Sequence, residues 1–197
     1  MRFSPFLFVF LLACETQESL PILGPYEQLN GEKRYHPVAD FELINQYGDK
    51  FNQASVRNKI RIVDFFFTSC PSICPKVQAQ MLRIQEKFIT HERLVFISHS
   101  IDTKRDTVER LRHYAHNLGI EEGMNWHFLT GDKDKIYDLA NDYFNIVVED
   151  ASAPGGYDHT GRIVLVDEQG FIRSYANGLN PEAVDTLMMD IALLLDS

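Results

Sequence analysis

An apolar run that leads directly into two cysteines constrains this chain more than any other feature. Residues 62–67 are rich in β-branched and aromatic side chains and contain a single carboxylate, Asp64. A run of this kind without alternation is typical of a strand buried on both faces of a parallel or mixed sheet. Pro75 suits the first position of a helix, and residues 76–89 carry roughly one apolar residue per turn. The sequence therefore predicts a buried strand followed by a helix, with both cysteines at their joint.

Cys70 and Cys74 would lie where this helix begins. The first turn of a helix has unpaired N–H groups and the positive end of the dipole, which favour thiolate over thiol, so both sulfurs are expected to ionise easily. If the chain between them is helix-like, their Cα atoms are about 6 Å apart, close enough for a disulfide or for one shared metal ion. Spacing alone does not choose between these, and a plain structural disulfide is the remaining alternative.

Asp64 stands six residues before Cys70. Desolvation in a buried strand raises the pKa of a carboxyl group, which would let Asp64 exchange protons with a cysteine. In this position relative to the cysteines, Asp64 resembles the buried aspartate of thioredoxins. A carboxylate bonded to neighbouring backbone, or turned to solvent on an edge strand, is the alternative that the sequence leaves open.

Residues 64–75 resemble the DFxFTxCxxxCP signature of the Sco/SenC family, which are thioredoxin-like copper-handling proteins of cytochrome c oxidase assembly. Residues 158–170 look like that family's third-ligand histidine with the strand and turn that follow it. Residues 100–107 also resemble a family segment, with Thr103 where a proline is usual. The likeness covers roughly residues 38–195.

The resemblance implies that Cys70, Cys74 and His159 bind a metal. Two thiolates and one imidazole form a soft donor set that suits copper(I), and with an added oxygen ligand they also hold copper(II). Zinc accepts the same donors, but a structural zinc site usually has four protein ligands. Three ligands leave a position open, which suits a site that passes its ion on. The implied function is a copper metallochaperone that delivers copper to the dinuclear site of cytochrome c oxidase.

The order of predicted elements indicates an α/β fold. A β-hairpin at residues 39–51 is followed by the pattern βαβαβα, a loop at residues 149–158, and then ββα. The resemblance adds a thioredoxin-like fold with an N-terminal β-hairpin and a loop insertion before the last β-hairpin. The loop is rich in Ala, Ser, Pro and Gly and is interpreted as mobile, so that His159 at its far end could swing away.

The predicted strand at residues 93–98 should end on the same side of the sheet as the cysteines. Because ligands gather beyond the carboxyl ends of parallel strands, His99 and Asp102 are secondary candidates for the site. For His99, an ordinary polar loop residue is the favoured alternative. Asp106 is expected to cap the helix that follows.

Thiol–disulfide reduction of partner cysteines outside the cytoplasm is the alternative function. This reaction needs only the two cysteines, with Cys70 as the attacking sulfur, whereas metal transfer needs His159 as well. A thioredoxin-type reductase usually has CxxC and a cis-proline, where this chain has CxxxC and His159. A peroxiredoxin-like peroxidase fits less well, because Phe67 stands where that PxxxTxxC motif has Thr or Ser. We therefore expect a non-enzymatic chaperone, with thiol–disulfide exchange as an added activity.

The N-terminus resembles a bacterial lipoprotein signal. A basic start and a short apolar run precede residues 11–14, Leu-Leu-Ala-Cys, which look like a lipobox. Residues 1–13 would be removed, Cys14 acylated, residues 14–37 would form a flexible tether, and residues 38–197 the Sco domain. The mature chain would be lipid-anchored in the cell membrane, facing the periplasm or the cell exterior.

Composition supports one globular domain, with 45% hydrophobic residues among 197. The formal net charge is −9, which disfavours nucleic acid and anionic membrane surfaces as partners. The expected partners are the copper-site subunit of cytochrome c oxidase or another copper chaperone.

Overall fold

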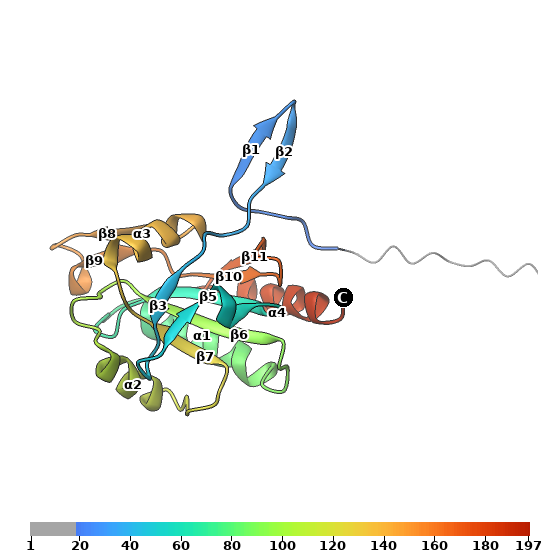
Figure 1. Cartoon of the computed structure of the whole chain (residues 1–197). Coiled ribbons are helices and arrows are strands. Elements are labelled where there is room, and N and C mark those ends of the chain that lie inside the picture. The colour runs from blue at the N-terminus through green and yellow to red at the C-terminus, as the bar shows by residue number, and fades with distance from the viewer. Residues whose placement is uncertain (1–18) are drawn as a thin grey trace, which may run out of the picture.

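A mixed five-stranded sheet forms the centre of the computed structural model, which describes residues 19–197 (Figure 1). Its strand order is β11-β10-β5-β6-β7. The central strand β5 is parallel to β6, which is parallel to β7, and β10 and β11 complete the sheet in antiparallel register. The bounds are β5 Ile60–Phe66, β6 Leu94–Ser100, β7 Trp126–Leu129, β10 Arg162–Val166 and β11 Ile172–Asn177. Every residue of β5 is buried, which confirms the predicted buried strand.

Across residues 19–197, four α-helices cover the two faces of this sheet. They are α1 Cys74–Lys87, α2 Val108–Asn117, α3 Lys133–Asp142 and α4 Pro181–Leu195. Helices α1 and α4 contact each other, and Phe66 of β5 packs against Tyr114 of α2 on that same side. The neighbouring Phe65 packs against Tyr143, which ends α3, because successive strand residues point to opposite faces. The thioredoxin-like α/β fold is thus confirmed, with helices on both faces.

Three two-stranded hairpins surround this core: β1 Tyr26–Leu29 with β2 Glu32–Tyr35, β3 Glu42–Ile44 with β4 Lys50–Asn52, and β8 Val147–Glu149 with β9 Tyr157–His159. The pair β3–β4 is the predicted N-terminal hairpin, and Ile44 bridges to Thr130 just beyond the edge strand β7. The pair β1–β2 stands away from the body of the domain (Figure 1) and lies within the segment interpreted as a tether. Its turn, Asn30-Gly31, has φ values of 53° and 87°, as type I′ turns require.

Two local expectations are corrected. Thr107, and not Asp106, caps α2, because its hydroxyl accepts the backbone N–H of Arg110 at 3.3 Å. The segment predicted as a mobile loop contains a short 3-10 turn at Pro154–Gly156 and the strand β9. His159 is therefore the last residue of a strand, paired with Val147, and not a residue in an unstructured loop.

The predicted signal at residues 1–13 and the acylated Cys14 lie outside the described residues. Within residues 19–197, no helix combines the length and apolar character needed to cross a bilayer.

Candidate metal centre

The fold brings Cys70, Cys74 and His159 together from three different elements. Cys70 follows β5, Cys74 is the first residue of α1, and His159 ends β9. Their donor atoms all lie within 4.8 Å of one another. His159 Nε2 is 3.4 Å from Cys74 Sγ and 4.0 Å from Cys70 Sγ. Donors about 2.0–2.3 Å from one shared ion in a trigonal arrangement would be roughly 3.5–4 Å apart, so the spacing fits a single metal ion.

Burial distinguishes the two cysteines. Cys74 is 2% exposed and Cys70 is 8% exposed, and both are free thiols. The backbone N–H of Cys74 points to Cys70 Sγ at 3.4 Å. Cys70 is thus slightly more exposed than Cys74, and its role as the attacking sulfur stays a prediction.

The two thiols have very different acidities. Interaction with Cys74 lowers the pKa of the Cys70 thiol, against the opposing effect of burial, and the contact with His159 Nε2 lowers it further. The hydrogen bond to Cys70 and burial both raise the pKa of Cys74 above the ordinary value for a thiol. The expectation that both sulfurs ionise easily is therefore wrong for Cys74. Within the reduced pair, Cys70 is therefore the more acidic thiol.

Asp64 lies in the central strand and is completely buried. Its carboxyl group accepts hydrogen bonds from Ser98 Oγ at 2.5 Å and from Gln78 Nε2 at 2.7 Å. Burial raises its pKa to about 7, as predicted. The alternative of a solvent-facing carboxylate on an edge strand is excluded. The role of Asp64 as a proton acceptor for a cysteine stays a prediction.

The two secondary candidates separate in the structure. His99 lies in the core, stacked on Phe65 with ring centroids 4.9 Å apart, and burial lowers its pKa to about 3. Asp102 is 1% exposed and accepts a hydrogen bond from the hydroxyl of Tyr157, two residues before His159. Only Asp102 therefore belongs to the surroundings of the metal centre.

The side chains of Phe67 and Tyr157 also belong to the surroundings of the metal centre, and sequence reasoning did not select either of them for the site. The ring of Phe67 lies 5.6 Å from that of His159 and 5.0 Å from that of Tyr157, measured between centroids. Gly155 sits against the same ring, because a Cβ there would be 2.7 Å from a Phe67 ring carbon. Its φ of 81° is in the left-handed region that favours glycine. The adjacent Gly155-Gly156 pair was the signal that a tight turn, and not an open loop, leads into β9.

The comparisons with known proteins agree with this geometry. The sequence model of a family described as SCO1/SenC matches residues 30–195. The chain is 30% identical over 187 residues to the SCO1 protein homolog of Bacillus subtilis (strain 168), covering 94% of this chain and 91% of that protein.

Solved structures give the same result. The structure of BsSco, a member of the Sco family of cytochrome c oxidase assembly proteins in which a disulfide switch was identified, matches with a TM-score of 0.73 and 25% identity. The match covers 90% of this chain and 98% of that one. ScoI of Bradyrhizobium japonicum with copper bound matches with a TM-score of 0.61 and 25% identity, over 78% of this chain and 99% of that one.

Proposed function

This chain belongs to the SCO1/SenC family, and we propose that it is a copper metallochaperone that delivers copper to a membrane-bound cytochrome c oxidase. The observation that carries the proposal is the convergence of Cys70, Cys74 and His159 on one point. Two sulfurs and one imidazole suit copper in preference to harder ions. The similarity to copper-bound ScoI supports the choice of ion, and the similarity to BsSco, a cytochrome c oxidase assembly protein, supports the choice of recipient.

Copper loading follows from the protonation states of the donors. Cys70 forms its thiolate more easily than Cys74, since interaction with Cys74 and His159 lowers its pKa. Cys74 releases its proton as its sulfur binds, because the thiolate is the metal ligand. His159 supplies the third donor from β9, with its Nε2 3.4 Å from Cys74 Sγ. With three ligands in place, a coordination position remains for a ligand of the recipient, which is the route by which the ion leaves.

We also propose that the chain is anchored to a membrane through Cys14 and faces away from the cytoplasm. The lipobox-like residues 11–14 support this, and the partner is the copper-site subunit of the oxidase or another copper chaperone. Mass spectrometry of the membrane-extracted chain should detect a lipid on Cys14. A chain that begins at Met1, without a lipid, would contradict the anchor.

Thiol–disulfide exchange is the second candidate, and the low pKa of Cys70 favours it. The Cys70 thiolate attacks a partner disulfide, forms a mixed disulfide and releases one partner thiolate. Cys74 then loses its proton and attacks Cys70 Sγ, which releases the second partner thiolate. The partner gains two electrons, and the chain is left with a Cys70–Cys74 disulfide.

A copper(I) titration of the reduced domain against a competing chelator tests the main proposal. The wild type should bind one ion tightly, and His159→Ala and Cys70→Ala should each weaken binding more than about 100-fold, because even groups that only support a ligand are worth 10- to 100-fold. His113→Ala, an exposed histidine on α2, is the matched control and should not change affinity. Affinity that is indifferent to His159 would instead favour the thiol reductant.

A further inference from the structure

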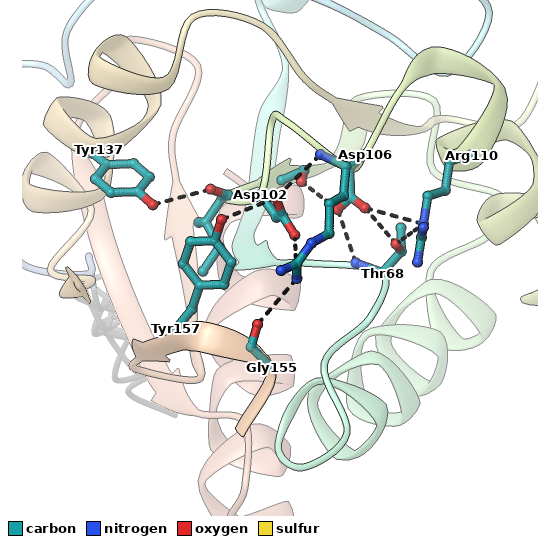
Figure 2. A network of polar contacts seen from close by, with 10 residues as sticks. Thr68, Asp102, Asp106, Arg110, Tyr137, Gly155 and Tyr157 are labelled. Carbon is teal, nitrogen blue, oxygen red and sulfur yellow. Dashed lines mark hydrogen bonds and ion pairs between the residues drawn. The ribbon is translucent and has the colours of Figure 1, made fainter. Parts of the chain in front are cut away.

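A chain of polar contacts that does not include the three donors links the segment before Cys70 to the segment before His159 (Figure 2). These two segments, which carry the two cysteines and the histidine, are the two halves of the metal centre. At one end, Asp106 accepts the backbone N–H of Thr68 at 3.0 Å and also its hydroxyl. Asp106 is fully buried and accepts a third hydrogen bond from Ser100 of β6. Because Thr68 stands two residues before Cys70, these contacts fix the start of the segment that carries the dithiol.

At the other end, the same turn holds the hairpin that carries the histidine. Asp102 Oδ1 accepts the hydroxyl of Tyr157 at 3.0 Å, and Asp102 Oδ2 is paired with Arg105 Nη1 at 3.2 Å. Arg105 Nη1 also donates to the carbonyl oxygen of Gly155 at 3.3 Å. Tyr157 and Gly155 belong to the segment that leads to His159, so residues 102–106 contact both halves of the site (Figure 2).

Two observations connect the position of His159 with this anchoring. First, β8 and β9 form a separate two-stranded sheet, and their hydrogen bonds do not extend to the central sheet. Second, His159 Nδ1 is buried and finds no hydrogen-bond partner in the described part of the chain, so no polar contact orients the ring from behind. Tyr157 and His159 are two apart in β9 and point to the same side of the strand. Holding Tyr157 therefore holds the face that presents the imidazole.

We propose that the Tyr157–Asp102 hydrogen bond is a positioning contact that keeps His159 over the dithiol and thereby sets how fast copper leaves. This rests on the proposed function, because it assigns a role in releasing the same ion. Breaking the bond frees β9 to move Nε2 away while Cys70 and Cys74 stay on the core. The hairpin is then the opening part of the site, although it is a strand pair and not a loose loop.

The substitution Tyr157→Phe tests this, because it removes one hydroxyl and keeps the ring on Phe67. Hydrogen bonds to charged groups are worth roughly ten- to hundredfold in an equilibrium. We expect the variant to keep one-to-one binding of copper(I) and to lose it to a chelator about tenfold faster than the wild type. Tyr137→Phe is the matched control, since its hydroxyl donates to Ile101 O in the same network but lies on α3 (Figure 2). That variant should release copper at the wild-type rate.

A double-variant cycle separates positioning of His159 from a general loss of structure. In a His159→Ala background, adding Tyr157→Phe should not change copper release, because the ligand that the bond positions is gone. An equal acceleration in both backgrounds would overturn the proposal.

Hydrogen exchange of the copper-free protein provides a readout that does not depend on metal. Amides of residues 147–159 should exchange about tenfold faster in Tyr157→Phe than in Tyr137→Phe. Unchanged exchange would overturn the positioning role even if copper binds as proposed. Conversely, a wild type that does not bind copper would overturn the proposed function, and faster exchange in that case would still support the anchoring of the hairpin.

Discussion

The buried Asp64 should make the stability of the domain fall as pH rises through neutrality. Its pKa is about 7 in the folded protein, against 3.8 for an unperturbed aspartate. A carboxyl group with a raised folded pKa favours folding below its unfolded pKa, where both states are protonated. That stabilisation is lost as pH rises through the folded pKa, because the folded state then has to accommodate a buried charge. The difference corresponds to about 4 kcal/mol above pH 7.

The substitution Asp64→Asn removes the titration and keeps a side chain of the same shape between Ser98 and Gln78. From the two pKa values, the wild type should lose about 2–3 kcal/mol between pH 5 and pH 8 that the variant does not lose. Urea unfolding of the reduced, copper-free protein at both pH values measures this difference. Because Asp64 is completely buried, solvent screening does not reduce the expected effect.

Asp138→Asn is the control, because Asp138 is exposed on α3. It should change unfolding free energy by the same small amount at both pH values. If the difference between wild type and Asp64→Asn were also independent of pH, Asp64 would be ionised in the folded state at pH 5. The argument from burial would then be refuted.

Three further predictions concern the thiols and the glycine turn. Iodoacetamide should modify Cys70 and not Cys74 at pH 5. Cys74→Ala should move the reaction of Cys70 to higher pH, because the interaction that lowers the Cys70 pKa most is lost, and equal reactivity of both sulfurs would contradict this. Copper(I) binding at pH 7 should release about one proton per ion, which comes from Cys74. Calorimetry in buffers of different ionisation enthalpy measures this number, and release of two protons would show that Cys70 is not ionised. Gly155→Ala should weaken copper retention in chelator competition, and stability in urea unfolding, by more than Gly156→Ala does. Both glycines have positive φ, but only Gly155 lies against Phe67, so equal effects of the two substitutions would exclude that contact as the cause.

Much of the fold was predictable because its signals are local. The apolar run gives β5, and Pro75 at the start of a regularly spaced apolar pattern gives α1. Asn180 followed by Pro181 predicts the start of α4, and the structure has that cap. The hairpin β1–β2 was missed although its Asn30-Gly31 turn is a recognised signal, because exposed polar strands show no apolar alternation.

What the sequence did not reveal depends on contacts between distant residues. Strand β9 has three residues, and the bond from Tyr157 to Asp102 that holds it spans 55 positions. Asp106 looks like a helix cap, but its carboxylate is used by Thr68, 38 positions earlier. A helix N-terminus predicted two acidic thiols, but interaction between the cysteines lowers the pKa of Cys70 and raises that of Cys74. Residue types near the site were therefore predictable, and the partners that tune them were not.

Copper carriage and thiol exchange use the same two sulfurs, so the two proposed activities exclude each other at any moment. A Cys70–Cys74 disulfide has no thiolate left, and His159 alone does not hold copper(I). Bound copper, in turn, occupies the Cys70 thiolate that would attack a disulfide. The reduced, metal-free pair is ready for either reaction, because the lowered pKa of Cys70 favours the thiolate that both reactions use. The redox state of the pair, and then the order in which metal or partner arrives, therefore decides which activity the domain carries out.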